Sequence, residues 1–390
     1  MYHKIKTGAY QPISQRYYRV TAWEKELIDV LLEQMLSAGI IVPSTSPWSS
    51  PAVLVAKKDS RTRFCVDYRA LNKITLDDPY PIARVEDALD LLEGCACFSL
   101  LDVAAMYWHV KMHPDDQAKT AFIVPQGLFE FTRMPFGLKN APATAARVMN
   151  RVLAGLNYVI CFVYFDDIIV FGRDQKEHDE RLRMVLNRMR QFNVKIRKHK
   201  CDFSKSCVDY LGYNIGVTGI SPSESNVATV WNFSEPSNVV ELRRFYGLCS
   251  YFHRFICNFS EILHPSTQLL KQGVAWCWED SRKRAFETLR NIIIEKPVLA
   301  CYKTDGAIEV HTNACDYGIG AVMYQQQKDG QFKPVCYIFR TLSPAEKNYG
   351  ITEKECLAIV WSLHCLRHYL YGRKFSVITD DCELCWFMTS

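Results

Sequence analysis

The sequence predicts a protein of the α/β (α+β) class with more than one domain. Residues 1–222 alternate between strand-like apolar runs and amphipathic helix patterns, residues 223–303 carry helix patterns, and residues 304–390 return to strands. The chain has 390 residues, of which 48% are hydrophobic and 23% are charged, so it can form two or three separate cores. We therefore predict three domains with boundaries near residues 222 and 303.

The composition indicates a folded protein of a reducing compartment. The 16 cysteines are scattered, and several lie inside apolar runs, as Cys65 and Cys161 do. The N-terminus lacks the apolar core of a signal peptide, and no stretch reaches the roughly 18 apolar residues of a membrane helix. We expect an intracellular protein without a membrane partner.

Two basic clusters suggest a polyanionic partner. One contains Lys57, Lys58 and Arg63, and the other spans residues 195–200 with four Lys or Arg residues. The net charge of +5 permits such a partner without requiring it. Both clusters adjoin apolar or aromatic strand patterns, which suits a phosphate backbone; solvated loops are the alternative.

The first elements are a helix and a hairpin. Thr21 and Glu24 form the pattern of a capping box, and the apolar face that follows ends at Gly39. Residues 52–57 and 63–68 read as two strands joined by a charged tip. This basic hairpin could fold over an anionic ligand or form a solvated loop.

A lone carboxylate ends the next predicted strand. A helix pattern over residues 85–92 leads to an apolar strand over 97–102, which closes with Asp102. A strand-end aspartate often caps the following turn, which is the structural alternative to a catalytic role. A second hairpin is predicted over 122–131, and a helix begins near Pro142.

The adjacent pair Asp166 and Asp167 is the strongest chemical signal. The flanking residues 161–164 and 168–171 read as the strands of a hairpin with the acidic pair at its turn. Carboxylates at a tight turn between buried strands are costly unless neutralised, and a divalent cation does this well. A surface Asp-Asp turn is the alternative. If strand pairing brings Asp102 to this pair, the three carboxylates suggest a two-metal phosphoryl-transfer site.

The remaining pattern alternates again between helices and strands. We predict a helix through Leu182 and Phe192, a basic strand over 195–200, and a hairpin turning at Leu211 and Gly212. The later predictions are a helix capped by Asn238, a helix over 282–294, strands over 308–312, 320–325 and 334–339, a helix start at Ser343–Glu346, a long helix over 352–371 and a strand over 375–379.

Four ordered motifs carry a family resemblance. They lie at residues 46–51 (SPWSSP), 65–69 (CVDYR), 133–142 (RMPFGLKNAP) and 164–167 (YFDD). With them the chain resembles the Pol polyprotein of gypsy-class LTR retrotransposons, over its reverse transcriptase and the first part of its ribonuclease H. The resemblance implies a right-hand polymerase with fingers and palm in 1–222, thumb and helical connector in 223–303, and a ribonuclease H-like α/β domain in 304–390 that we expect to be C-terminally truncated.

The resemblance also implies a reaction and its metal. Asp102, Asp166 and Asp167 match the catalytic, metal-binding triad of the palm. Mg²⁺, with Mn²⁺ as an alternative, would activate the primer 3′-hydroxyl for attack on a dNTP and neutralise the leaving pyrophosphate. The implied partners are an RNA or DNA template with its primer, and dNTPs. The implied location is cytoplasmic, in a retroelement particle, with a nuclear phase.

The other implied site residues bind nucleotide and primer. Lys57 or Lys58 with Arg63 would contact the triphosphate, and Tyr107 matches the steric gate that excludes a ribose 2′-hydroxyl. Phe136 and Gly137 would line the nucleotide pocket. The turn Leu211-Gly212-Tyr213 resembles the primer grip.

Two departures from the family pattern favour a second hypothesis. Ala105-Met106 replaces the usual Ser-Gly before the gate tyrosine, and we expect Met106 to crowd the incoming sugar. Asn313 stands where ribonuclease H has its first metal aspartate, whereas Glu355 and Asp380 match the second and third acidic positions. We therefore expect no ribonuclease H activity. The competing hypothesis is a catalytically dead nucleic-acid-binding remnant of a retrotransposon, from a decayed copy or a fragmentary gene.

Overall fold

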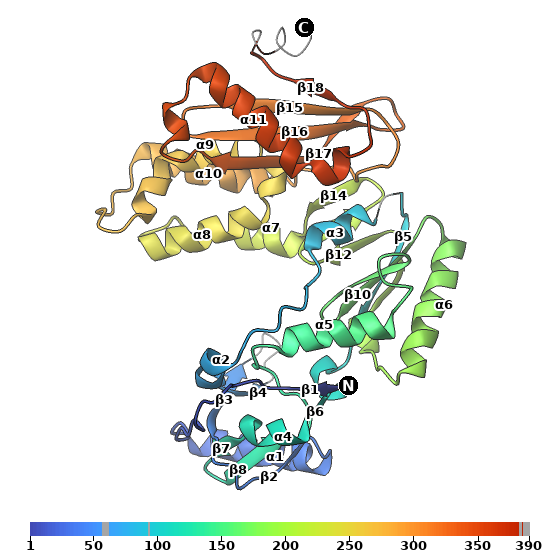
Figure 1. The fold of residues 1–390 in the computed structure, drawn as a ribbon, viewed down its shortest axis with the longest axis vertical. Coiled ribbons are helices and arrows are strands. Elements are labelled where there is room, and N and C mark those ends of the chain that lie inside the picture. The colour runs from blue at the N-terminus through green and yellow to red at the C-terminus, as the bar shows by residue number, and fades with distance from the viewer. Residues whose placement is uncertain (57–61, 93, 382–383, 385–390) are drawn as a thin grey trace. The chain divides into compact units, whose positions relative to one another are not determined.

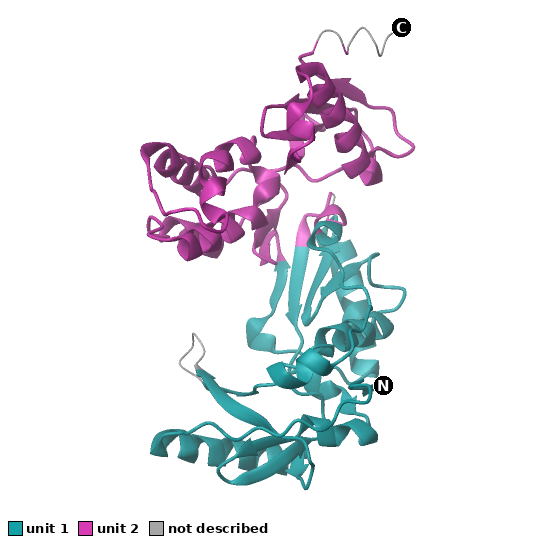
Figure 2. Ribbon diagram, turned by 60° about the vertical axis from the view of Figure 1, so that its left-hand side comes forward, with its two compact units in different colours: residues 1–88, 98–204 teal, residues 89–97, 205–390 magenta. Residues whose placement is uncertain are grey.

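The computed structural model describes residues 1–56, 62–92, 94–381 and 384. The chain divides into two compact units, which Figure 2 shows in different colours. Unit 1 contains Met1–Ala88 and Phe98–Ser204, and unit 2 contains Leu89–Cys97 and Lys205–Ser390. The predicted boundaries at 222 and 303 are finer than this division and stay predictions.

Unit 1 begins with a five-stranded sheet. Its strands, in spatial order, are β2 (Ile41–Pro43), β8 (Gly127–Phe131), β7 (Phe122–Val124), β3 (Ser50–Ala56) and β4 (Thr62–Val66). Both predicted hairpins are present, since β3 pairs with β4 and β7 with β8 in antiparallel register. The predicted first helix is α1 (Ala22–Ser37), and its capping box forms as expected from Thr21 and Glu24.

A second, four-stranded sheet of unit 1 carries the acidic residues. Its order is β11 (Asp202–Lys205), β5 (Cys97–Asp102), β10 (Asp167–Gly172) and β9 (Cys161–Tyr164). The hairpin β9–β10 is the one predicted around the acidic pair. Consecutive residues of a strand face opposite sides of the sheet, and Ile168, Ile169 and Val170 are all fully buried. Both faces of β10 are therefore buried, and α5 and α6 lie beside this sheet (Figure 1).

Helix α6 (Gln175–Gln191) is tied to this sheet through a buried histidine. The His178 side chain is fully buried, and its Nε2 lies 2.9 Å from Ser99 Oγ on β5. The same hydroxyl accepts a hydrogen bond from the backbone N–H of Ser204, at 3.0 Å. Ser99 thus connects α6 and β11 to β5, the strand that ends in Asp102. The other elements of unit 1 are β1 (Tyr2–His3), α2 (Arg69–Ile74), β6 (Lys111–Met112), α4 (Pro114–Gln117) and α5 (Ala141–Val152). Helix α3 (Val85–Asp90) begins in unit 1, and its last two residues are counted in unit 2.

The predicted basic strand over 195–200 is wrong. Ile196 makes a single antiparallel bridge with Val103, and residues 198–200 form a short 3₁₀ turn. The N–H of Lys200 donates to the carbonyl of Arg197, at 2.8 Å, so this donor is satisfied within the turn. A strand ladder cannot continue past a residue whose donor is used locally.

Unit 2 contains a small antiparallel sheet and a group of helices. The sheet has the order β12 (Cys207–Tyr210), β13 (Tyr213–Gly216) and β14 (Gly219–Pro222), which confirms the predicted hairpin at Leu211 and Gly212. The helices are α7 (Glu224–Trp231), α8 (Val239–Tyr251), α9 (Phe259–Thr267) and α10 (Asp280–Ile294). Asn238 caps α8 as predicted. An aromatic contact between Phe245 and Phe286, with ring centroids 4.5 Å apart, joins α8 to α10.

A second sheet of unit 2 follows these helices. Its order is β17 (Phe332–Thr341), β16 (Gly318–Gln326), β15 (Ile308–Ala314) and β18 (Ser376–Ile378), with β18 parallel to β15. Helix α11 (Ile351–Cys365) packs on β15 and β16, and α12 (Arg367–Leu370) follows it. The described part of the chain has no helix with the length and apolar character needed to span a bilayer.

Two helix predictions in this region need correction. The N–H of Ser343 donates to the Glu346 carboxylate, and the N–H of Glu346 donates to Ser343 Oγ, as in a capping box. Only the 3₁₀ turn Glu346–Asn348 follows, however, and not an α-helix. The chain becomes extended at Tyr349, where ψ is 149°, and α11 starts anew with its own capping interaction. The predicted long helix over 352–371 is also interrupted, since Leu366 lies between α11 and α12.

Candidate active site

The fold brings the three predicted carboxylates of unit 1 together. Asp102 is the last residue of β5, Asp167 is the first residue of β10, and these strands are neighbours. The N–H of Val103 donates to the carbonyl of Asp166 at 2.9 Å, which fixes the acidic turn beside the end of β5. Strand pairing therefore brings Asp102 to the acidic pair, as the sequence predicted.

The turn that carries Asp166 is strained. Tyr164 and Asp167 are register partners, so the hairpin loop consists of Phe165 and Asp166 alone. Phe165 has φ of 55°, a conformation that hairpins of this length usually assign to glycine or asparagine. Such a residue costs of order 1–3 kcal/mol and persists where surrounding structure enforces it. Here the Phe165 ring packs against that of Tyr164, with centroids 4.6 Å apart.

Mutual repulsion perturbs the acidic cluster. Partial burial, together with the negative charges of Asp166 and Asp102, raises the pKa of Asp167 to about 6. Arg197 and Lys200 act in the opposite direction and do not cancel the effect. Burial, with a contribution from the charge of Asp166, also raises the pKa of Tyr107, which places this tyrosine beside the cluster. Burial and the neighbouring carboxylates therefore both disfavour the ionised form of Asp167.

The guanidinium of Arg197 is paired with Asp102, one of the three carboxylates. Arg197 Nε donates to Asp102 Oδ1 in an ion pair, although the two residues are 95 positions apart in the sequence. Sequence reasoning assigned Arg197 to a basic cluster and missed this contact, for which the local sequence holds no signal.

The carboxylates fit the chemistry of a divalent cation, but they are not arranged as a ready metal cage. Carboxylate oxygens are the ligands that Mg²⁺ prefers, and a nearby cation would offset the burial and like-charge repulsion that raise the pKa of Asp167. Among the residues that the structure describes, no group of three His, Cys, Asp or Glu side chains is placed to hold a metal ion. The Asp102–Arg197 ion pair supplies a structural reason, because it directs Asp102 Oδ1 to the guanidinium.

Three predicted nucleotide-binding residues also converge in unit 1. The rings of Tyr107 and Phe136 meet edge to face, with centroids 4.9 Å apart. The Arg63 guanidinium carbon lies 5.5 Å from the centre of the Phe136 ring, in a cation–π contact. Arg63 comes from β4, Tyr107 from the 3₁₀ turn after β5, and Phe136 from the loop before α5. Lys57 and Lys58 lie outside the described residues.

Gly137 holds the Phe136 loop against the five-stranded sheet. Its φ is +93°, and a Cβ at this position would lie 3.3 Å from the carbonyl oxygen of Val66. Asn72 clamps the loop from the other side, since its Nδ2 donates to the Gly137 carbonyl and its Oδ1 accepts from the N–H of Lys139, both at 2.8 Å. Asn72 is a site-shaping residue that sequence reasoning did not identify.

The expectation that Met106 crowds an incoming sugar is not supported. Its side chain is only 2% exposed and belongs to the core of unit 1. Ala105, the residue before it, has φ of 46°, and this left-handed turn sets up the 3₁₀ segment that carries Tyr107. The methionine therefore fills the protein interior.

The predicted primer-grip residues form a tight turn in unit 2. Leu211 and Gly212 both have positive φ, and Tyr210 and Tyr213 are register partners across the turn. The Tyr251 hydroxyl donates to the Leu211 carbonyl at 2.5 Å, and Asn226 Nδ2 donates to the Gly212 carbonyl at 3.0 Å. A Cβ on Gly212 would meet that amide at 2.5 Å. The turn is therefore rigidly held from two helices.

The ribonuclease H-like positions lie on the second sheet of unit 2. Glu355 on α11 accepts a hydrogen bond from the N–H of Ala314 at 2.8 Å. Burial, with the charges of Asp380 and Asp381, raises the pKa of Glu355, so these carboxylates are near one another. Ala314 packs towards α11, and Asn313 therefore projects from the other face of β15.

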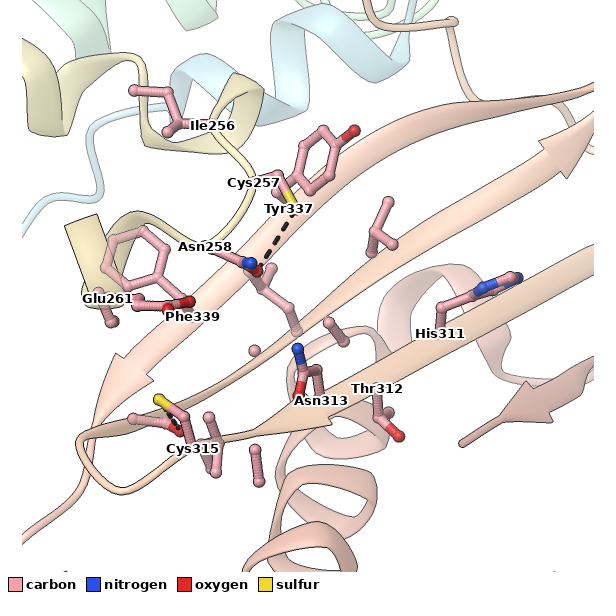
Figure 3. Close-up of a pocket in the computed structure, with 18 residues that line it drawn as sticks. Ile256, Cys257, Asn258, Glu261, His311, Thr312, Asn313, Cys315, Tyr337 and Phe339 are labelled. Carbon is pink, nitrogen blue, oxygen red and sulfur yellow. Dashed lines mark hydrogen bonds between the residues drawn. The ribbon is translucent and has the colours of Figure 1, made fainter. Parts of the chain in front are cut away.

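Asn313 faces a pocket on that other face (Figure 3). The pocket is a cavity of about 250 Å³ between β15–β17 and the segment that leads into α9. Asn258, Glu261 and Tyr337 are among its lining residues. The amide of Asn313 is exposed there, whereas Thr312 is buried on the α11 side.

Two family models match the chain. One is described as reverse transcriptase (RNA-dependent DNA polymerase) and matches residues 55–215, and the other is described as an RNase H-like domain found in reverse transcriptase and matches residues 278–377. The first range includes Asp102 and the Asp166–Asp167 hairpin, and the second includes Asn313 and Glu355.

Curated relatives are polyproteins of transposons. The chain is 35% identical to the retrovirus-related Pol polyprotein from transposon 297 of Drosophila melanogaster, over 98% of this chain and 36% of that protein. It is 33% identical to the transposon Tf2-3 polyprotein of Schizosaccharomyces pombe, over 95% of this chain and 28% of that protein. The chain thus spans about a third of the length of these relatives.

Solved structures of foamy viral enzymes share the fold. The foamy viral protease-reverse transcriptase dRH in complex with double-stranded DNA superposes with a TM-score of 0.89 at 24% identity, over 100% of this chain and 68% of that chain. The foamy viral protease-reverse transcriptase in complex with RNA/DNA hybrid superposes with a TM-score of 0.81 at 24% identity, over 97% of this chain and 51% of that chain. The chain therefore belongs to the reverse transcriptase family, the RNA-directed DNA polymerases, and joins that polymerase to an RNase H-like domain as in LTR retrotransposon Pol polyproteins.

Proposed function

We propose that this chain extends a primer 3′-hydroxyl with dNTPs on an RNA template, using Mg²⁺ held by Asp102, Asp166 and Asp167. The observation that carries the proposal is the pairing of β5 with β10, which collects the three carboxylates at one end of a buried sheet. Divalent ions bound there would lower the pKa of the primer hydroxyl and neutralise the leaving pyrophosphate, and Mn²⁺ is the alternative ion.

The aromatic and basic residues around the cluster suit a nucleotide. In our proposal the edge-to-face rings of Tyr107 and Phe136 form the wall against the sugar, with Tyr107 excluding a 2′-hydroxyl. Arg63 is exposed above Phe136 and supplies a positive charge for the triphosphate. Gly137 and Asn72 support this function by fixing the loop that carries Phe136.

A primer–template duplex is the proposed macromolecular partner. Two of the similar foamy viral structures are complexes with double-stranded DNA and with RNA/DNA hybrid. In this chain Lys195 and Lys198 lie in the same basic segment as Lys200, whose charge acts on Asp167. The turn Leu211-Gly212-Tyr213 is proposed to hold the primer. Binding through phosphates should weaken steeply as salt rises.

Primer extension on an RNA template tests the proposal. We expect Asp166→Asn to abolish incorporation at any Mg²⁺ concentration, because it removes a carboxylate from the centre of the cluster. Asp202→Asn is the matched control, since Asp202 is an exposed carboxylate on β11 of the same sheet. Incorporation should continue in this control. If the wild-type chain binds primer–template but extends nothing with Mg²⁺ or Mn²⁺, the dead nucleic-acid-binding alternative replaces the proposal.

We further propose that the RNase H-like domain does not cleave RNA. Asn313 offers a neutral amide where the family has its first metal aspartate, and an amide cannot bridge two cations as a carboxylate does. Cleavage of the RNA strand in a labelled hybrid should therefore be absent even when primer extension is active.

A further inference from the structure

The contact between Arg197 and Asp102 is built into the fold. The N–H of Arg197 donates to the Asp102 carbonyl at 2.9 Å, and the N–H of Ala104 donates to the Lys195 carbonyl at 2.8 Å. These bonds flank the bridge between Val103 and Ile196, so the backbones of the two segments are held in register. Arg197 is therefore placed opposite Asp102 by main-chain geometry, and its side chain needs only to extend to reach the carboxylate.

The guanidinium and a divalent cation would compete for the carboxylate of Asp102. Arg197 Nε donates to Asp102 Oδ1, and the two side chains are 35% and 16% exposed. A Mg²⁺ ion held by Asp102 would take its ligands from the carboxylate oxygens and would repel the positively charged guanidinium beside them. The half-exposed Arg197 side chain, in contrast, can move into solvent at little cost.

We propose that Arg197 is a displaceable counter-ion that occupies Asp102 in the metal-free protein and lowers the metal affinity of the site. This inference rests on the proposed function, since it assumes that Asp102 is a metal ligand. It explains why three carboxylates gather at the site although no described group is placed to hold a metal ion. If the guanidinium occupies the carboxylate in part of the molecules, only the remaining fraction is free to bind metal. The apparent Kd is then the intrinsic Kd divided by that free fraction.

The test measures metal binding directly. Mn²⁺ is titrated into the full chain without primer or nucleotide, and free Mn²⁺ is followed by electron paramagnetic resonance. We expect Arg197→Gln to lower the Kd by about fivefold, the change that corresponds to the loss of a partly exposed ion pair. Lys200→Gln is the matched control, because Lys200 also acts on the charge of Asp167 but does not pair with Asp102. Its effect should stay below about twofold.

A double-mutant cycle identifies the carboxylate involved. In an Asp102→Asn background, Arg197→Gln should change the Kd no more than Lys200→Gln does, because the contact with Asp102 is gone and only the charge effect on Asp167 remains. Circular dichroism checks that each variant is folded. If Arg197→Gln does not fold, Arg197→Met keeps a long side chain, removes the charge and the donors, and should lower the Kd in its place. An Arg197 effect no larger than that of Lys200→Gln, or weaker Mn²⁺ binding by Arg197→Gln, would overturn the proposal.

The readout separates this inference from the proposed function. Primer extension by the wild-type chain with an unchanged Kd in Arg197→Gln would overturn the counter-ion role alone. The expected change in Kd without primer extension by any variant would support the counter-ion role and overturn the polymerase activity. Absence of Mn²⁺ binding by wild type and all variants would overturn the inference and its assumed metal ligand together.

Discussion

Asp167 is the residue whose chemistry depends most on its neighbours. Its carboxylate is partly withdrawn from water and faces the charges of Asp166 and Asp102, which together raise its pKa to about 6. The unfolded chain has no such neighbours, so the ordinary carboxyl pKa near 3.9 applies there. The folded state thus disfavours the ionised form, and its stability falls as pH rises from about 4 through 6.

We predict that Asp167→Asn stabilises the metal-free protein at neutral pH. The asparagine cannot ionise, so the repulsion is removed. The side chain keeps contact with solvent, which reduces the gain to about 1 kcal/mol at pH 7.5. At pH 4 the wild-type carboxyl is protonated in the fold, and the two proteins should have equal stability. Urea unfolding at both pH values checks this, and an equal gain at pH 4 would contradict it.

Arg197 and Asn72 make contacts at the site that could not be predicted from the sequence. Both act on the site across long sequence separations, Arg197 on Asp102 and Asn72 on Gly137. Neither belongs to a motif with a local spacing that predicts its contact. In contrast, the carboxylates could be found because an acidic pair inside a β-branched run is costly without a cation.

At the scale of elements, the loop that carries Phe136 depends on its fit to β4. Gly137 has φ of +93° and lies against the carbonyl of Val66, with the ring of Tyr68 also in contact range. Both the backbone conformation and the lack of space exclude a side chain. The position of Phe136, and through it the contact with Tyr107, follows from this packing.

We predict that Gly137→Ala destabilises the protein by about 2–3 kcal/mol and raises the KM for dNTPs more than it lowers kcat. The cost combines backbone strain with the clash against Val66. Gly155→Ala is the matched control, since Gly155 has φ of +77° but open space around its Cβ position. This control should lose only about 1 kcal/mol, with an unchanged KM. Thermal unfolding and steady-state incorporation kinetics measure both effects. Equal losses in the two variants would show that packing against Val66 is unimportant.

The elements that could be predicted are those with purely local causes. The hairpins at 52–66, 122–131, 161–172 and 207–216 follow from alternation and turn residues, and the cap at Thr21 follows from a four-residue pattern. The predictions over 195–200 and at Ser343–Glu346 were wrong because local backbone hydrogen bonds and backbone conformation ended the predicted strand and helix. Lys200 closes a 3₁₀ turn in the first case, and the chain extends at Tyr349 in the second.

At the scale of the whole molecule, unit 2 includes a segment from an early part of the chain. Residues 89–97 belong to it, although the chain on either side of them lies in unit 1 (Figure 2). The Tyr369 hydroxyl on α12 donates to both carboxylate oxygens of Asp90, at 2.9 and 3.0 Å. Arg254, which is 6% exposed, also interacts with the charge of Asp90. One carboxylate thus serves a buried hydroxyl and a buried guanidinium.

We predict that Asp90→Ala destabilises unit 2 by about 3 kcal/mol. The change removes the acceptor of the buried Tyr369 hydroxyl and one of the negative charges that act on the buried Arg254. Leaving a buried donor unsatisfied costs about 1–3 kcal/mol, and more for a charged group. Hydrogen exchange should therefore accelerate in α12 and β15 of unit 2. The exposed Asp87, on the same helix α3, provides the control, and Asp87→Ala should leave exchange in these elements unchanged. Similar exchange rates in the two variants would exclude the proposed role of Asp90.

The sequence by itself determined most of the elements, the candidate acidic residues and the family, because these depend on local periodicity and on ordered motifs. Tertiary structure alone decided that Arg197 pairs with Asp102, that Met106 is buried, that Asn72 clamps Gly137 and that Asp90 belongs to unit 2. Each of these outcomes depends on which distant segment supplies the opposite charge, the cavity or the hydrogen-bond partner. Such contacts are set by chain topology, and local sequence does not encode them.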